Sequence, residues 1–534
     1  MTKYISFINR QINQICEGGL HVLYKKVKKL SWLLFMNIFA LLAVWLKADW
    51  PKAYGFVGKK NIKRLKKLYT QANPDELAIK RTGDLVIRYF KTIADRDPVP
   101  VDVQDWIEAS RILEGMYFFT GEINKMNAVL QKTAEVQRDI AKAYQFDDLG
   151  IEFLSEFLAV GSIGTYEFLD THVKSGILGL RPSKKMILLV NPKASVNNPC
   201  YLNYWRRYIT IISDPRLIRT LSPLQKRFEV PLNSYMTLNG KTYKSFLALG
   251  IIREQWIKDK RKPILTISDE DYARGWQCLK SFGMRQGDWF VCLHVREGGW
   301  KDKNSLVENF RNANIQTYIP AIKAVTDAGG WVVRMGDSTM EPLPEMPKVI
   351  DYAHSDEKSD WMDVFLCAQS RFFVGTSSGL FIFAITFGTP IVATNFMPTC
   401  CAYYLTSADL FIPRACKFKR EDRFLNFNEL FSPKIGTAAV QSRYDQEDIE
   451  IIENSEEEIK SLVGEMLRKC DGNLKYSEED EGLQGLFRSV TLDCGKLYGE
   501  EGAVVNARIG KEFLRKHAAL LPSREGSVVT IDIK

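Results

Sequence analysis

The sequence predicts an α/β fold whose centre is a doubly wound parallel sheet. The prediction depends on a regular alternation of short buried strands and helices after residue 288. Segments 289–295 and 331–335 are apolar runs of strand length, and segment 317–327 between them has helical spacing and ends at a pair of glycines. Strands that alternate with helices in this way build a parallel sheet covered by helices.

The stretch 371–395 is the most informative part of the chain. It predicts a strand, a loop of small residues, a buried helix, a tight turn and a second strand at 390–394. The loop, Thr376-Ser377-Ser378-Gly379, lies where the first strand gives way to the helix. Such a junction points free N–H groups and a positive dipole end at one place, which suits a phosphate or diphosphate. The alternative is a plain strand–helix turn in which serine only caps the helix.

Polar residues follow the predicted strands at the edge where parallel sheets bind ligands. Arg296 and Glu297 follow the first of these strands, and Asp337 follows the second. We expect them to converge on one crevice with the small-residue loop. Because arginine binds phosphate oxygens through two parallel N–H bonds, we expect Arg296 to bind a diphosphate rather than form a surface ion pair. For Asp337 and His294, a ligand role and a structural role both stay open.

The chain before these strands is predicted to contain more helix than strand. Residues 61–179 have helical spacing, clearest at 107–119 and 123–144, and core packing explains them without any chemistry. Residues 185–190 predict a short buried strand. We interpret 201–212 as an amphipathic core helix, although its aromatic and basic residues would also suit an acceptor.

The two ends of the chain differ in character. The formal net charge is +9, and basic clusters gather in the first seventy residues around the apolar segment 30–46. We expect this segment to be an in-plane anchor on an anionic membrane surface, with a single span second and a buried core helix third. No RNA-binding motif or DNA-reading helix accompanies the basic residues, so no nucleic-acid partner is expected. Near the other end, Ser455 and Glu458 predict a capped helix start.

The sequence gives no reason to expect a metal. The ten cysteines form no CxxC pair and only five histidines are present, which argues against a Cys/His zinc site and fits a reduced, cytosolic protein. Neither a GxxxxGK[ST] loop nor a GxGxxG after a strand occurs. The acidic triplets 95–97 and 269–271 follow no predicted strand, and we interpret Asp360 with Asp363 as a capping pair. Protein groups would therefore neutralise a diphosphate.

Four blocks of sequence resemble a bacterial family of glycosyltransferases: HVREGGWKD (294–302), VVRMGD (332–337), SDWMDVFLCAQSRFFVGTSSGLFIFAITFGTP (359–390) and ADLFIP (408–413). This family is itself similar to the protein O-fucosyltransferases and related GT-B enzymes. In those enzymes a strand that ends in His-x-Arg delivers an arginine to the nucleotide diphosphate, and a serine-rich loop before a helix binds the same group. The resemblance implies these roles for Arg296 and for the loop that begins at Thr376. One departure is Gly299, which stands where the fucosyltransferase pattern often has aspartate.

The resemblance implies a GT-B-like fold and sugar transfer from a nucleotide diphosphate sugar to an acceptor hydroxyl, without a metal. The acceptor would be a glycan, a lipid-linked sugar or a protein in bacterial surface glycan synthesis, at the inner face of the membrane. Five regions are expected: a membrane-associated segment (1–58), a helical region (59–180), a Rossmann-like acceptor domain (181–287), a Rossmann-like nucleotide-sugar domain (288–435) and a helical tail (436–534). The expected donor-binding residues are Arg296, Asp337, Thr376, Ser377, Ser378 and Gly379.

Transfer also needs a base that activates the acceptor hydroxyl. We expect Glu297 in this role, with His294 as the second choice. Two other functions stay open, namely a non-catalytic scaffold for polysaccharide enzymes and a nucleotide-sugar epimerase on the same fold.

Overall fold

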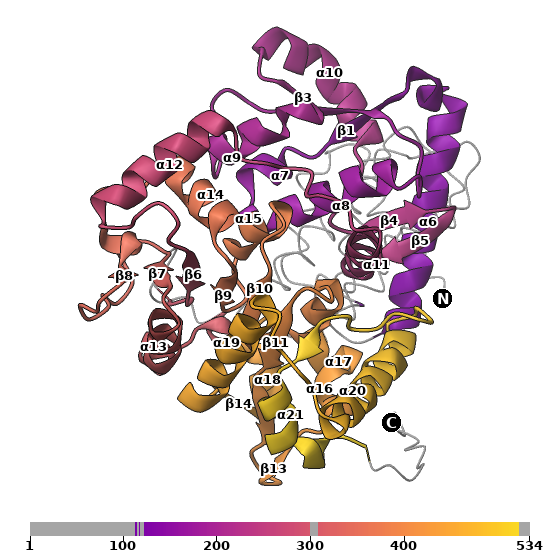
Figure 1. Cartoon of the computed structure of the whole chain (residues 1–534). Helices are drawn as coiled ribbons and strands as arrows, with labels where there is room; N and C mark the ends of the chain where they lie inside the picture. The colour runs from indigo at the N-terminus through magenta and orange to yellow at the C-terminus, as the bar shows by residue number, and fades with distance from the viewer. Residues whose placement is uncertain (1–109, 111–112, 115–116, 118–121, 299–307, 523–534) are drawn as a thin grey trace, which may run out of the picture.

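The chain folds into two lobes, each built on a parallel sheet (Figure 1). The computed structural model describes residues 110, 113, 114, 117, 122–298 and 308–522. We call 122–288 the N-terminal lobe and 289–522 the C-terminal lobe. The expected membrane anchor at 30–46 lies outside the described residues, and no described helix is long and apolar enough to cross a membrane.

The N-terminal lobe contains a small sheet of three parallel strands in the order β1-β2-β3. Its strands are β1 (Ile151–Leu154), β2 (Lys185–Leu189) and β3 (Ile209–Ile212), followed by the β4–β5 hairpin (Tyr235–Leu238 and Lys241–Lys244). Its helices are α6 (Ile123–Ala143), α7 (Phe157–Val160), α8 (Tyr166–Ile177), α9 (Pro199–Tyr204), α10 (Pro215–Phe228), α11 (Ser245–Lys258) and α12 (Asp269–Ser281). A small apolar cluster of Phe146, Phe153 and Leu189 lies under Ile218 and Leu221 of α10.

Two expectations about this lobe are wrong. The segment 61–179 is not wholly helical, because β1 pairs with β2 and the sheet begins at Ile151, before the expected boundary at residue 181. The segment 201–212 is not one helix either, because α9 ends at Tyr204 and the chain enters β3 at Ile209. Ile209–Ile212 is a β-branched run, which favours a strand once a neighbour such as β2 is present. The expected strand at 185–190 is confirmed as β2.

The C-terminal lobe contains a sheet of seven strands in the order β15-β11-β10-β9-β6-β7-β8, and every pairing in it is parallel. The strands are β6 (Phe290–His294), β7 (Trp331–Arg334), β8 (Val349–Ile350), β9 (Phe373–Gly375), β10 (Ile391–Phe396), β11 (Leu410–Pro413) and β15 (Arg508–Ile509). Without the outermost β15, this order is the 3-2-1-4-5-6 order of doubly wound sheets. The predicted doubly wound parallel sheet is therefore confirmed.

Further elements complete this lobe. Its helices are α13 (Ile319–Asp327), α14 (Asp360–Gln369), α15 (Phe381–Thr386), α16 (Phe427–Phe431), α17 (Pro433–Gly436), α18 (Gln441–Gln446), α19 (Glu456–Cys470), α20 (Glu478–Leu497) and α21 (Lys511–Lys516). A small antiparallel sheet consists of β12 (Ala415–Phe418), β13 (Arg423–Phe424) and β14 (Ile449–Ile452). The expected capping box is confirmed at α19, where Ser455 and Glu458 each satisfy a backbone N–H of the other.

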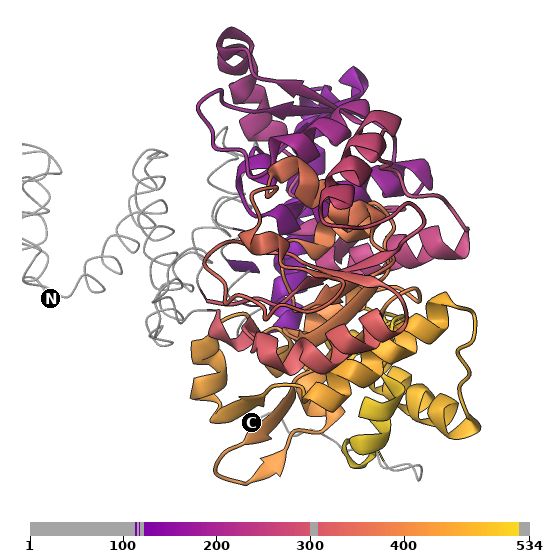
Figure 2. The same cartoon turned by 60° about the vertical axis from the view of Figure 1, so that its left-hand side comes forward.

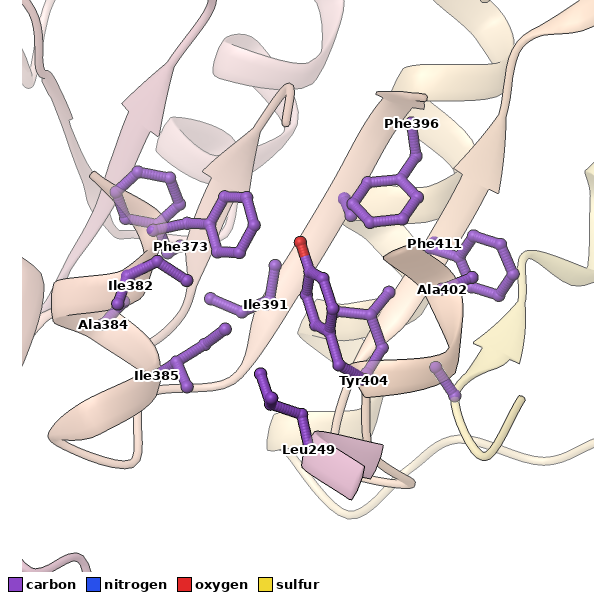
Figure 3. Close-up of a cluster of buried hydrophobic side chains, with 14 of the residues drawn as sticks. Leu249, Phe373, Ile382, Ala384, Ile385, Ile391, Phe396, Ala402, Tyr404 and Phe411 are labelled. Carbon is purple, nitrogen blue, oxygen red and sulfur yellow. The ribbon is translucent and has the colours of Figure 1, made fainter. Parts of the chain in front are cut away.

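The central strands are buried on both faces, which explains their continuous apolar sequences. Figure 3 shows one part of this core, where Phe373, Ile391 and Phe411 of neighbouring strands lie together with side chains of α15 and of the 3₁₀ helix η8 (Thr399–Tyr404). Leu249 of α11 reaches the same cluster from the N-terminal lobe. One apolar core therefore continues from one lobe to the other.

The lobes are joined by close contacts. Gly250 of α11 lies so near the carbonyl oxygen of Tyr403 that a Cβ atom would have no room there. The Tyr201 hydroxyl lies 2.8 Å from Thr386 Oγ1, and the ring of Tyr201 packs on Phe383 of α15. Figure 2 shows the same arrangement from another side, with the purple lobe above the orange and yellow one. The loop before α15 consequently faces residues of both lobes.

Candidate functional site

The central strands β6 and β9 are neighbours, although β7 and β8 separate them in sequence. This is the point at which the order of strands along the sheet reverses, and parallel sheets bind ligands beyond the carboxyl ends of such strands. The two strands approach closely because Gly375 has no side chain, and a Cβ there would collide with the carbonyl oxygen of His294. The strands therefore deliver His294 and Arg296 on one side and the loop from Thr376 on the other.

Hydrogen bonds fix the two chain segments at this point. The N–H of Arg296 donates to Thr376 Oγ1 at 3.0 Å, and the N–H of Thr376 donates to the carbonyl oxygen of His294 at 3.2 Å. The buried hydroxyl of Thr376 is thus a structural acceptor in this structure. The sequence predicted that Arg296 and the loop at Thr376 converge, and this convergence is confirmed.

Backbone donors are free in the loop itself. The N–H groups of residues 377–381 donate no hydrogen bond to any residue that the structure describes. Ser377 Oγ accepts from the N–H of Met397 at 3.3 Å, while Ser378 Oγ is buried without a partner among the described residues. Unsatisfied buried donors are costly, so such a run of N–H groups is expected to bind water or an anion.

The opposite wall of the loop belongs to the N-terminal lobe. A Cβ on Gly379 would lie 3.3 Å from Ile163 Cβ and 3.4 Å from the backbone nitrogen of Gly164. Both belong to the 3₁₀ helix η3 (Ile163–Thr165) that precedes α8. Any larger residue at position 379 must displace this wall, so the loop and η3 together form one close boundary between the lobes.

Arg296 lies in a polar network after β6. Its Nη2 donates to Glu308 Oε2 at 2.8 Å, and its Nη1 donates to the Glu308 carbonyl oxygen at 3.1 Å and to Asn312 Oδ1. Burial and the nearby charge of Arg311 lower the pKa of Arg296, and Glu308 opposes this change. The Arg296 side chain keeps 24% of its surface exposed, so it is accessible to a ligand.

Two further arginines contact the polar network around Arg296, and the sequence analysis did not identify them. Arg311 donates to the same Glu308 carboxylate, and Arg414, at the carboxyl end of β11, donates to the carbonyl oxygen of Asn312. The Nε atoms of Arg311 and Arg414 are buried without a partner among the described residues. The guanidinium groups of Arg296 and Arg311 therefore share the one exposed carboxylate of Glu308, while Arg414 lies 3.9 Å from the carboxylate of Glu453. Arg311 ends a short 3₁₀ helix (Asn309–Arg311) and Arg414 directly follows β11, so neither belongs to a periodic pattern that the sequence could reveal.

Glu297, the residue expected to act as the base, is engaged on both carboxylate oxygens. Its Oε1 accepts from Arg334 Nη2 at 3.0 Å, and its Oε2 accepts from the N–H of Glu341 at 2.7 Å. The Arg334 side chain is fully buried and also bonds Asp351 at 3.1 Å. In this arrangement Glu297 neutralises a buried arginine and fixes the loop after β7, so it accepts a proton only if it leaves these partners.

His294 lies at the end of β6 with 6% of its surface exposed. Burial lowers the pKa of His294 to about 3, with further lowering by the charge of Arg334 and an opposing effect of Asp337. The imidazole is therefore neutral at pH 7, and its Nδ1 is buried without a partner among the described residues. A neutral imidazole with a free nitrogen is suited to a hydrogen bond with a ligand hydroxyl or phosphate.

Asp337 follows β7, next to β6, as the strand pattern predicted. Its Oδ1 accepts from the N–H of Thr339 at 2.9 Å and from the Thr339 hydroxyl, which forms a local turn. Gly336 before it has a φ of 142°, and Met340 fills the space that a side chain would need. Asp337 thus stabilises the turn in this structure, and its ligand role stays a prediction.

A charged cluster lies on α8 and α11 of the N-terminal lobe, where Arg253 packs over the ring of Tyr404 in the other lobe. Glu167 and Asp170 of α8 face Arg253 of α11, and each of these three side chains has an atom without a partner among the described residues. Burial raises the pKa of Glu167 to about 8, with Arg253 lowering it and Asp170 raising it. Helical periodicity alone marked α8 as core, so sequence reasoning missed this group.

The described residues contain no group of three or more His, Cys, Asp or Glu side chains that could hold a metal ion. The acidic triplet 269–271 forms the first turn of α12, where Ser268 accepts from the N–H of Asp271. The interpretation of Asp360 with Asp363 as a capping pair is wrong, because the N-cap of α14 is Ser359 and Asp363 pairs with Lys358. The nine described cysteines are all free thiols.

Comparisons with known proteins give only distant similarity. No protein-family model matches the chain, and no curated protein does. Among solved structures, the chain is similar to the iron-containing dodecameric glycosyltransferase TibC of enterotoxigenic E. coli H10407, with 14% identity and a TM-score of 0.27 over 46% of this chain and 57% of that one. The match thus spans less than two thirds of TibC.

Two further solved structures show the same level of similarity. A family 9 glycosyl transferase of Veillonella parvula DSM 2008 has 11% identity and a TM-score of 0.33, over 49% of this chain and 85% of that one. The E. coli ADP-heptose LPS heptosyltransferase II has 13% identity and a TM-score of 0.29, over 56% and 99%.

Proposed function

We propose that the chain is a GT-B-like glycosyltransferase that binds a nucleotide diphosphate sugar beyond the carboxyl ends of β6 and β9. One observation carries the proposal. At the strand-order reversal of a doubly wound sheet, a run of free backbone N–H groups at 377–381 adjoins Arg296, which has Arg311 close by. Free amides and bidentate guanidinium groups are the two kinds of donor that a diphosphate needs.

The proposed reaction transfers the sugar to an acceptor hydroxyl. The main demand of this chemistry is to stabilise charge on the departing diphosphate, and preorganised donors do this best because they need no rearrangement during the reaction. Arg296 and the amides of Ser377, Ser378 and Gly379 would supply this stabilisation. Asp337 would contact the donor from the next strand, and the acceptor would approach from the N-terminal lobe.

The two candidate bases have different environments. Glu297 would have to leave Arg334 before it takes a proton from the acceptor, whereas His294 already has a free Nδ1. Because the pKa of His294 is so low, its imidazole suits the orientation of a hydroxyl better than the storage of a proton. We therefore keep Glu297 as the proposed base and assign His294 to substrate orientation.

The remaining expectations belong to this proposal. They are a metal-independent reaction, a glycan, lipid-linked or protein acceptor, and a cytoplasmic location at the inner face of a bacterial membrane, with the segment 30–46 as the anchor. The charge pattern of the first seventy residues supports the membrane surface as a partner.

A ligand screen by thermal unfolding tests the proposal. A molecule that binds only the folded protein raises the midpoint of unfolding according to its concentration and affinity. We expect at least one nucleoside diphosphate or its sugar conjugate to stabilise the full chain, and this effect to be lost in Arg296→Ala. Donor hydrolysis or transfer to an acceptor should accompany binding. Stabilisation by no nucleotide would contradict the proposal and would favour a scaffold, whereas conversion of the free nucleotide sugar would favour an epimerase.

A further inference from the structure

The helix α10 (Pro215–Phe228) is unusual among the described helices of eight or more residues. It is the only one of them without a single buried residue. Its inner side, with Ile218, Leu221 and Phe228, only partly covers the small apolar cluster on the N-terminal sheet. Figure 1 places the helix on the outer side of this lobe, away from the seven-stranded sheet. Most of α10 is therefore surface.

This surface combines two features that rarely occur together on a solvated helix. Leu217 and Leu224 are seven residues apart and continue the i, i+4, i+7 spacing of Leu221 and Phe228, so they lie at the edge of the inner side, where they are 51% and 39% exposed. Arg216, Arg219 and Lys226 are exposed on the other faces of the helix and form no ion pair with a described residue. No acidic residue lies within the helix, and the carboxylate of Asp214, just before it, caps its first turn.

We propose that α10 is a docking surface for an anionic lipid membrane. A helix that has exposed leucines on one side and unpaired Lys and Arg on the other can lie in the plane of a membrane interface. The leucines would enter the boundary with the acyl chains, and the basic residues would bind the head groups. The proposal concerns a surface that is separate from the β6–β9 crevice, and it does not depend on nucleotide binding.

The charge of α10 and its exposed leucines favour an anionic membrane over the N-terminal segment of the chain and over a nucleic acid. The N-terminal segment 1–109 holds 19 Lys and Arg against 10 Asp and Glu, so its charge does not favour contact with a basic helix. A nucleic acid would satisfy the basic residues but would leave Leu217 and Leu224 in water. Anionic lipid satisfies both features. The acidic first turns of α19 and α20 lie in the C-terminal lobe, which orients that lobe away from an anionic surface.

The orientation would serve the proposed activity. With α10 on the membrane, the N-terminal lobe lies between the lipid surface and the nucleotide-binding sheet. An acceptor that is held in the membrane would then reach the boundary between the lobes from the lipid side, while a soluble donor enters from the cytoplasm. This consequence rests on the proposed function, whereas the docking of α10 does not.

Hydroxyl-radical footprinting of the full chain tests the proposal. Because the first seventy residues are also basic, total vesicle binding does not report on α10, and the readout must be local. Leucine oxidation is measured by mass spectrometry with phosphatidylglycerol-containing vesicles, with phosphatidylcholine vesicles and without lipid. We expect anionic vesicles to protect Leu217 and Leu224. Leu497, which is 47% exposed at the end of α20 in the other lobe, should stay unprotected and serves as the control.

A charge variant makes the test specific. In R216Q/R219Q/K226Q, the vesicle concentration at half protection should rise about fivefold for each residue removed. The matched control R420Q/K460Q/K496Q loses the same charge in the C-terminal lobe and should leave the protection unchanged. Equal oxidation of Leu217 and Leu224 with and without anionic vesicles would overturn the proposal. Protection by RNA but not by lipid would also overturn it and would assign the surface to a nucleic acid. Protection without lipid that grows with protein concentration would overturn it too and would assign the surface to a second copy of the chain.

Discussion

Substitutions of Arg296 and of Glu308 should change the affinity for a diphosphate in opposite directions. The two side chains form an ion pair at 2.8 Å, in which Glu308 is 47% exposed and Arg296 is 24% exposed. If Arg296 binds the diphosphate, the carboxylate of Glu308 competes with the ligand for the same guanidinium group. Removing the arginine then weakens binding, while neutralising the carboxylate strengthens it.

The structure sets the size of both effects. Arg296→Ala removes a charge-assisted contact from a partly enclosed site, which costs about 2–4 kcal/mol, or roughly 30- to 900-fold in affinity. Glu308→Gln releases an ion pair in which the carboxylate is half exposed, and such pairs contribute about 0.2–1 kcal/mol. We therefore expect Glu308→Gln to tighten binding by up to about fivefold.

Isothermal titration calorimetry of the full chain with inorganic pyrophosphate, ADP, GDP and UDP measures both effects at constant ionic strength. The pair Arg371–Asp471 is a matched control, because its side chains are 25% and 48% exposed but Arg371 precedes β9 at the opposite edge of the sheet. Arg371→Ala should leave affinity unchanged. If Glu308→Gln weakens binding as much as Arg296→Ala does, the pair is structural and the reasoning fails.

Three other predictions concern pH and metal. The pKa of His294 is about 3 in the folded chain and about 6.5 in the unfolded chain, so the free energy of unfolding falls as pH drops below 6.5, by about 2 kcal/mol between pH 7 and pH 5. Urea unfolding at the two pH values should show a smaller loss of stability in His294→Gln. An equal loss in the variant and the native chain would contradict the buried neutral state. The pKa of Glu167 is raised to about 8, so the unfolded chain ionises first and stability falls as pH rises from about 4.5 to 8. Glu167→Gln should therefore gain stability relative to the native chain at pH 8 but not at pH 4, and the opposite sign would place Glu167 in an ion pair. Because Arg296 and the loop amides would neutralise the diphosphate, donor turnover should survive EDTA, and a loss that manganese or magnesium restores would refute this.

The sequence was sufficient for the central sheet and for the convergence of its strand ends. β6, β7, β9 and β10 are buried on both faces, so each is an apolar run that a local pattern reveals. Once strands and helices alternate, the parallel order places Arg296 and Thr376 at one edge. The free amides of the loop were also predictable, because small residues at a strand–helix junction favour that geometry.

Other features depend on contacts that the local sequence does not contain. Glu152 interrupts the apolar run of β1 and is buried only because His172 and Arg181 pair with it. The strand β3 follows directly after a helical turn, so its apolar residues continued the helical pattern. The engagement of Glu297 with Arg334, and of Arg296 with Glu308, arises from packing between loops. Residue type and strand position identified these side chains, but their partners could not be predicted.

A structure of the full chain with a bound nucleoside diphosphate tests the central claim most directly. We expect the diphosphate to lie beyond the carboxyl ends of β6 and β9, to accept hydrogen bonds from N–H groups within 377–381, and to contact the guanidinium group of Arg296. A diphosphate bound elsewhere on the chain would contradict the claim. So would crystals that stay empty at millimolar concentrations of every nucleoside diphosphate.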